Sequence, residues 1–267
     1  MQEKIDIAKV RHDGEVWSFI IMLLTSVVAL LVLVVSVVGL VWLLVFVIIE
    51  LFLHRLMMAF FYANSVKVTE SQYPVLYRLA REYTARLGLK RVPDIYIIQQ
   101  TTLNAFATRA ARRNVVVVFS HTVETMIEQE QTDALGMVLG HEMGHLAANH
   151  LRWAGIFGGA ALINPLFYLF WSRCCEYTAD RLGYLCVGSA SGASEGLLKL
   201  TVGKQMARVT DMAALAQQYN SVRKNFFVRL SELVSTHPHL LNRIHRLRDF
   251  SEKTTVSPAP PAKGVTA

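Results

Sequence analysis

Two histidines and a glutamate lie close together near the middle of the chain, in the segment Gly140-His141-Glu142-Met143-Gly144-His145. This H-E-x-x-H pattern predicts a metal site if the segment is helical. Residues four apart lie on one face of a helix, so the imidazoles of His141 and His145 can bind one zinc ion. Glu142 lies between them, where its carboxylate can take a proton from a water molecule at the metal. The alternative is a chance pair of surface histidines.

A second acidic segment downstream supplies the carboxylate that such a site needs. Glu176 is the candidate third ligand, because two histidines and one glutamate leave a coordination position open, as in catalytic zinc sites. Asp180 follows one helical turn later and is the candidate partner for the free N–H of a ligand histidine. The alternative for Asp180 is an exposed helix acid beside Arg181. The sequence thus predicts one Zn²⁺ per chain, held by His141, His145 and Glu176.

Other potential ligands are not expected to bind this ion. A metzincin site needs a glycine and a third histidine at fixed spacing, and those positions hold Ala148 and Leu151. His150 would lie nearly opposite His141 around a helix, so we do not expect it to be a ligand. Three cysteines cannot all pair within one chain, and their apolar surroundings predict buried free thiols in a reducing compartment. They are Cys174, Cys175 and Cys186.

These residues resemble the gluzincin metallopeptidases of the family that contains the CAAX prenyl proteases and the HtpX heat-shock protease. The resemblance spans about residues 66–250 in order and spacing. Two further segments carry it: Asn104-Ala105-Phe106-Ala107 is similar to the family's N-A-F segment, and Ser235-Thr236-His237-Pro238 with Arg243-Ile244 is similar to its C-terminal signature. From the residues alone, Asn104 would be a turn or cap residue and His237 a surface or cap residue.

The resemblance implies a zinc endopeptidase that binds a polypeptide substrate. Asn104, Ala105 and Phe106 would lie on a strand beside the substrate cleft, where an extended peptide can be held by backbone hydrogen bonds. His237 would stabilise the oxyanion of the tetrahedral intermediate. Glu142 would act as the catalytic base. Two other classes of function stay open: a membrane-anchored chaperone or binding module with a structural zinc site, and a zinc hydrolase acting on something other than a peptide.

A long apolar segment precedes these motifs, with no charged side chain between Val16 and Ile49. One helix of that length would measure roughly 50 Å, against a hydrocarbon core of about 30 Å. Two transmembrane helices near 17–35 and 38–54, turning close to Ser36, therefore fit better. A single tilted helix is the alternative.

Basic residues flank the apolar segment on both sides and predict its orientation. Lys4, Lys9 and Arg11 precede it, and Arg55 and Lys67 follow it. With a hairpin, the positive-inside rule puts both flanks and the catalytic domain on the cytoplasmic side. We therefore expect an integral protein of the bacterial inner membrane.

The composition agrees with a membrane protein and argues against a nucleic-acid-binding one. Hydrophobic residues make up 53% of the 267 residues, and the net charge of +7 is spread along the chain. No phosphate-binding glycine loop or aromatic-basic module is present, so we expect the lipid bilayer as a partner and no nucleic acid. Nothing in the sequence predicts an oligomeric state.

These features together predict an α+β fold, a mainly helical zincin-like metallopeptidase domain with a small β-sheet behind an N-terminal transmembrane hairpin. The predicted divisions are a polar segment 1–15, a membrane region 16–63, the domain 64–250 and a disordered tail 251–267. Within the domain we expect helices at 71–88 and 132–150 and strands at 94–99 and 114–119. A Gly/Ser/Ala loop at 188–196 would precede helices near 195–208, 211–219 and 222–234.

Two further patterns concern the helices around the site. Gly136, Gly140 and Gly144 recur every four residues, which predicts that another element packs closely against this stripe. The apolar segment 153–171 must turn back on itself, since a single crossing would separate His145 from Glu176. Gly158-Gly159 and Asn164-Pro165 offer breaks, and the segment would pack on the domain, dip into the membrane interface or form a short membrane hairpin.

Overall fold

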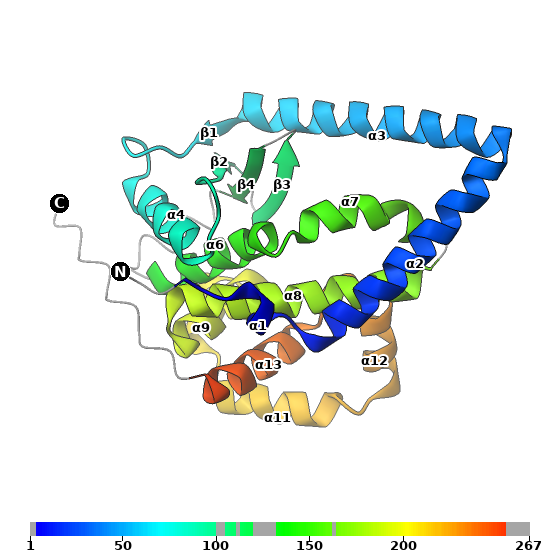
Figure 1. Cartoon of the computed structure of the whole chain (residues 1–267). Helices are drawn as coiled ribbons and strands as arrows, with labels where there is room; N and C mark the ends of the chain where they lie inside the picture. The colour runs from blue at the N-terminus through cyan, green and yellow to red at the C-terminus, as the bar shows by residue number, and fades with distance from the viewer. Residues whose placement is uncertain (1–3, 100–104, 111–112, 120–131, 162–163, 255–267) are drawn as a thin grey trace.

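The computed structural model describes residues 4–99, 105–110, 113–119, 132–161 and 164–254 (Figure 1). It is mainly helical with one small sheet behind two apolar N-terminal helices, which confirms the predicted fold class. The elements are α1 (Ile7–Val10), α2 (Asp13–Val35), α3 (Val37–Asn64), β1 (Ser65–Lys67), α4 (Pro74–Arg86), β2 (Asp94–Ile98), β3 (Ala105–Ala110), β4 (Arg113–Phe119), α6 (Thr132–Ala147), α7 (His150–Ala161), α8 (Pro165–Val187), α9 (Ala190–Val202), α10 (Lys204–Val209), α11 (Met212–Val222), α12 (Phe226–Leu233) and α13 (Leu240–Lys253).

The two apolar helices α2 and α3 are each long and apolar enough to cross a membrane, and most of their apolar side chains are exposed. The chain breaks between them at Ser36, whose hydroxyl caps α3 by accepting a hydrogen bond from the backbone N–H of Gly39 at 3.2 Å. Figure 1 shows them meeting at one apex, with their other ends at the domain. The hairpin prediction is confirmed over the single long helix.

Helix α3 extends ten residues beyond the predicted end of the second span, at 54, and reaches Asn64. Its last turns pack on one face of the sheet. Met58 is buried against strand residues, and the ring of Phe61 lies 5.1 Å from that of Phe106. The His54 imidazole also makes a 2.7 Å hydrogen bond with the backbone carbonyl of Arg109.

The sheet has the strand order β1-β2-β4-β3. β2 and β4 are parallel, whereas β1 and β3 run antiparallel to their neighbours. The β-branched run Val115–Val118 explains β4. All four valines are buried, Val116 and Val118 on one face of the sheet and Val115 and Val117 on the other. β3 stands at one end of the strand order and pairs in register, with Phe106 opposite Val117. Strand β3 is therefore the strand next to α6 (Figure 1).

Helices α6 and α8 form the centre of the domain, and the glycine stripe is what lets them pack closely. A Cβ on Gly140 would lie 3.0 Å from Gly183 Cα, and one on Gly144 would lie 3.1 Å from Leu182 Cβ. Larger side chains would hold the helices apart. The prediction of a close-packed element is confirmed, and that element is α8, which carries Glu176 and Asp180.

The zinc-motif helix ends earlier than predicted, at Ala147 rather than at His150. Asn149 adopts a left-handed backbone conformation (φ 63°), which terminates α6. Asparagine is one of the few residues other than glycine that tolerate this conformation. The next helix, α7, then starts at His150 in a new direction. Because of this break, the position of His150 cannot be obtained by continuing α6.

The predicted loop at 188–196 is wrong for most of its length, because α9 already begins at Ala190. Ser189 caps that helix by accepting a hydrogen bond from Gly192 N–H at 3.1 Å. The small residues serve close packing rather than flexibility: a Cβ on Gly196 would lie 3.0 Å from Met137 Cβ in α6. The helices predicted after this segment correspond to α9–α12, which are separated at Gly203, at Thr210-Asp211 and before Phe226.

The apolar segment 153–171 turns back as predicted, with α8 starting at Pro165. Gly158-Gly159 do not break α7, which continues to Ala161. Both helices pack on the first turns of α2. The ring of Phe19 lies 4.6 Å from that of Trp153 in α7, and Trp171 of α8 belongs to the same buried cluster as Met22 of α2. The segment thus packs against the membrane helix, and its entry into a bilayer stays a prediction.

The chain before α2, predicted as a polar segment, packs on the domain from residue 4 onward. Val10 is buried in the main core, and the Arg181 guanidinium donates to the carbonyls of Val10 and Arg11 at 3.0 and 3.1 Å. At the other end, α13 continues to Lys253, and the rest of the predicted disordered tail lies outside the described residues. The start of α2 is consequently fixed beside α8.

Candidate metal centre

Three side chains from α6 and α8 converge on one point: His141, His145 and Glu176. The two Nε2 atoms lie 3.2 Å apart, and each lies near a Glu176 oxygen, at 3.5 Å for His141 and 3.3 Å for His145. Tetrahedral ligands about 2.0 Å from zinc stand roughly 3.3 Å apart from one another. The donor set and its spacing therefore fit zinc, with both histidines offering Nε2.

The outward-facing nitrogen of His141 is held by residues of α8 and α13. His141 Nδ1–H donates to Asp180 Oδ1 at 2.9 Å, and Arg243 in α13 donates to both oxygens of that carboxylate at 2.7 and 2.9 Å. Burial opposes a charge on His141, but in the metal-free site the hydrogen bonds to Asp180 and Glu176 outweigh it and raise its pKa to about 10, so zinc would have to displace the proton on Nε2. Asp180 thus lies where a carboxylate can fix the tautomer of a ligand histidine.

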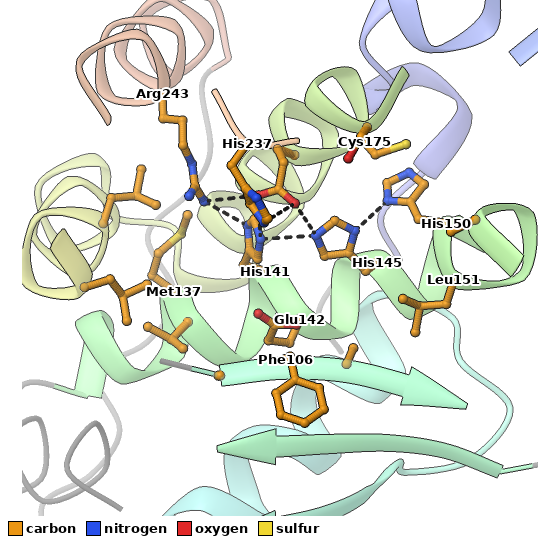
Figure 2. A pocket seen from close by; sticks show the side chains of 18 of the residues that line it. Phe106, Met137, His141, Glu142, His145, His150, Leu151, Cys175, His237 and Arg243 are labelled. Carbon is orange, nitrogen blue, oxygen red and sulfur yellow. Dashed lines mark hydrogen bonds and ion pairs between the residues drawn. The ribbon is translucent and has the colours of Figure 1, made fainter. Parts of the chain in front are cut away.

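The outward-facing nitrogen of His145 is held differently, by His150 at the start of α7. The two Nδ1 atoms are 2.9 Å apart (Figure 2), and His150 Nε2 lies 3.2 Å from Oε1 of Glu15 in α2. His150 is buried, and desolvation, with neighbouring His145 and Arg11, lowers its pKa well below the usual value. The structure puts His150 behind His145, away from the point where the three ligands meet.

The carboxylates of the site differ in their surroundings. Burial would raise the pKa of Glu176, yet hydrogen bonds to His141 and His145 lower it well below its usual range, so the ligand is ionised. Burial would also raise the pKa of Asp180, but the guanidinium of Arg243 lowers it below its usual value. Glu142 is half-buried and lines the same cavity as the three ligands, on the side of α6 that faces β3 (Figure 2).

The cavity at the three ligands has a volume of about 270 Å³. Ala105, Phe106 and Ala107 line it from β3, so two of the predicted substrate-binding residues lie beside the ligands. Asn104, the third, lies outside the described residues. An extended chain bound along β3 would pass close to Glu142.

His237 reaches the site from the loop before α13. Its side chain is 64% exposed, and its Nε2 lies 3.5 Å from Glu176 Oε1. Its other ring nitrogen makes a 2.9 Å hydrogen bond with the Thr236 hydroxyl. The imidazole therefore stands at the mouth of the cavity with one nitrogen directed at the ligands (Figure 2).

All three cysteines are free and buried, which confirms their prediction as core residues. Burial raises the pKa of Cys174 to about 11 and that of Cys186 to about 12. Cys175 lines the cavity, and its pKa is raised well above the usual value by burial and neighbouring acidic groups. Such thiols stay protonated near neutral pH and are poor ligands.

Three residues that support the proposed ligands have contacts that their sequence patterns do not predict. Arg243 belongs to the C-terminal signature, which assigns it no role, and the H-E-x-x-H spacing bears on His150 only as a possible ligand. Glu15 belonged to the polar N-terminal segment. A basic residue in the C-terminal motif was a usable signal for Arg243, but no pattern in the sequence connects Glu15 with His150.

Comparison with known proteins identifies a family of peptidases that the chain matches. Residues 70–163 and 152–251 match the sequence profile described as peptidase family M48. A protease HtpX homolog of Thermodesulfovibrio yellowstonii is 26% identical over 76% of this chain and 83% of its own. One of Bifidobacterium longum is 27% identical over 73% and 76%, and one of Streptococcus pyogenes is 25% identical over 70% and 77%. No solved structure matches the chain.

Proposed function

The chain belongs to peptidase family M48, and from this premise we propose that it is a membrane-anchored zinc endopeptidase. The family and the two apolar helices make it a membrane-associated metalloprotease. One observation carries the finer assignment. His141, His145 and Glu176 converge at distances suited to zinc, in a cavity that Glu142 also lines.

When bound, zinc would act as a Lewis acid that makes a water molecule acidic at neutral pH and polarises the scissile carbonyl. His141, His145 and Glu176 would hold it and leave one position open. Glu142 accepts the proton of the attacking water and later delivers it to the leaving amine. Asp180 keeps the His141 proton on Nδ1, so that Nε2 stays available as a ligand atom.

The remaining predicted residues would act on the substrate. Ala105 and Phe106 line the cavity from β3 and would align an extended polypeptide with the ligands. Asn104, directly before them, takes the same role in this proposal. His237, with Nε2 3.5 Å from Glu176 Oε1, would donate a hydrogen bond to the oxyanion of the tetrahedral intermediate.

The arrangement of the anchor supports a cytoplasmic active site in the bacterial inner membrane. Both ends of the α2–α3 hairpin join the domain, so the flanking basic residues lie on the same side of the membrane as the site. The substrates would then be misfolded or membrane-associated polypeptides that reach the cytoplasmic surface. A bilayer and a polypeptide are the partners this proposal requires.

The rival function is a membrane-anchored chaperone or binding module whose zinc is structural. Such a module has no need of an acid beside the ligands, so the position of Glu142 favours the peptidase. The test is cleavage of casein by the detergent-purified protein, before and after metal removal by a chelator and after return of Zn²⁺. We expect cleavage that stops on removal and recovers on return. Zinc bound at one per chain with no cleavage of casein or of other loosely folded proteins would contradict the proposal.

A further inference from the structure

The geometry points to Glu15 of the first membrane helix as a positioning residue for His145, acting through His150. This inference rests on the proposed function, since it concerns one of the proposed zinc ligands. It assigns a role to a residue of α2, a helix that so far has been only an anchor.

The protons of this chain of side chains can be counted. With Nε2 of His145 directed at the other ligands, its proton must be on Nδ1, which donates to His150 Nδ1 at 2.9 Å. Since His150 accepts at Nδ1, its own proton is on Nε2, which donates to Glu15 Oε1 at 3.2 Å. Every group thus has a partner of the right kind, ending at a carboxylate.

Glu15 is itself firmly held, as a residue that orients others must be. It is 3% exposed, and its Oε2 accepts a 2.5 Å hydrogen bond from the Thr178 hydroxyl in α8. Arg11 forms an ion pair with Oε1 and donates to the Ala148 carbonyl at 2.8 Å. The carboxylate is therefore fixed to the helix that carries Glu176 and to the end of the helix that carries His145.

A second metal site is the competing explanation, because Glu15, His150 and Cys175 also lie within 4.8 Å of one another. The contacts argue against it. Both ring nitrogens of His150 and both oxygens of Glu15 already have hydrogen-bond partners, and one partner of Glu15 is the cation Arg11. A divalent ion there would stand beside a guanidinium and would have to displace the proton that His150 Nε2 donates to Glu15.

Loss of this support should weaken metal binding without removing a ligand. Outer partners of ligand histidines typically change metal affinity by about 10–100-fold. The break at Asn149 is what brings His150 to His145, and α2 supplies the final acceptor. The proposed metal centre is therefore completed by the docked membrane helix.

The first test exchanges His150 in the full-length protein in detergent. His150→Leu has no acceptor for His145 Nδ1–H, whereas the side-chain carbonyl of His150→Gln can accept a hydrogen bond from it. We expect the zinc Kd, measured by competition with a chromophoric chelator, to rise about 10–100-fold in His150→Leu and to recover most of that loss in His150→Gln. The visible spectrum of bound Co²⁺ should change in His150→Leu and return toward wild type in His150→Gln. Equal losses in both variants would overturn the role of the hydrogen bond.

The second test separates the effect of the hydrogen-bonded chain His145–His150–Glu15 (the relay) from effects on general stability. Glu15→Gln removes the charge at the end of the relay, and we expect the zinc Kd to rise roughly tenfold. The control, Ser18→Ala, removes a buried side-chain hydrogen bond to the backbone of the same helix and leaves every contact of the Glu15 carboxylate in place. It should lower the thermal midpoint and leave the zinc Kd within about twofold. A wild-type protein that binds no zinc would contradict the proposed function, whereas wild-type affinity in Glu15→Gln and His150→Leu would overturn this inference alone. A second zinc ion lost in Cys175→Ala would replace it with a metal site.

Discussion

The two histidines proposed as zinc ligands differ in what holds them. His141 is held by Asp180 and Arg243, which belong to α8 and α13 of the peptidase domain. His145 is held by His150 and Glu15, and Glu15 belongs to the membrane helix α2. One ligand thus depends on the packing of the domain alone, and the other also depends on the anchor. The comparison indicates that anchor and metal centre form one structural unit.

The largest expected effect comes from separating α6 from α8, which would break the His141 side of the comparison. In Gly140→Val the new side chain would meet Gly183 Cα, already 3.0 Å from where a Cβ would stand. Glu176 and Asp180 would move away with α8, so we expect bound zinc, measured by elemental analysis, to fall to near zero. The matched control is Gly155→Ala, whose Cβ meets nothing within 4 Å. Full zinc content in Gly140→Val would show that the close approach is not required.

A smaller loss is expected when only the support of His141 is changed. Asp180→Asn leaves the buried Arg243 facing a neutral side chain and weakens the fixation of His141. Breaking one partner of a buried ion pair typically costs about 3 kcal/mol, so the thermal midpoint should fall by several degrees. The zinc Kd should rise about 10–100-fold. Unchanged midpoint and affinity would mean that this ion pair does not hold the ligand.

Combined variants sharpen the comparison further. Glu15→Gln and His150→Leu act on one relay, so their joint effect on the free energy of zinc binding should be well below the sum of the single effects. Glu15→Gln and Asp180→Asn act on different ligands, and their effects should add within about 0.5 kcal/mol. The quantity to measure is the zinc Kd of all single and double variants. Additivity in the first pair would mean that Glu15 does not act through His150.

The smallest effect is expected at the cysteines, of which only Cys175 lies beside Glu15 and His150. Burial raises the pKa of Cys174 to about 11, so at pH 8 about one thiol in a thousand is ionised, and the fraction rises tenfold per pH unit. The folded protein should resist iodoacetamide at pH 8, as measured by mass spectrometry, whereas the unfolded protein should react at all three positions. Rapid labelling of the native thiols would contradict their burial. Cys175→Ala should keep one zinc ion per chain.

The predictable part of the molecule is the part that depends on local spacing. H-E-x-x-H on one helix face and the glycines at 136, 140 and 144 follow from helix periodicity, and the structure has both as expected. The apolar run gave the hairpin, with a turn at Ser36. Asp180 was found because it lies one turn from Glu176.

The remaining features depend on contacts that no local pattern records. A left-handed residue at Asn149 redirects the chain. Helical periodicity therefore predicts His150 opposite His141, whereas the structure brings it into contact with His145. Glu15 lies 135 positions before its partner His150, and its pairing follows from how α2 docks. The small residues at 190–196 are typical of a loop, yet they form the first turns of α9. They are small because α6 packs closely against them.

The central claim is that Glu142 is the base of a zinc peptidase, and one measurement tests it most directly. Wild type and Glu142→Gln are purified side by side in detergent, and their casein cleavage and bound zinc are quantified. We predict equal zinc, at one ion per chain, and a loss of at least about a hundredfold in cleavage for Glu142→Gln. Equal zinc with undiminished cleavage would contradict the assignment of the base. Zinc missing from both proteins would contradict the metal centre itself.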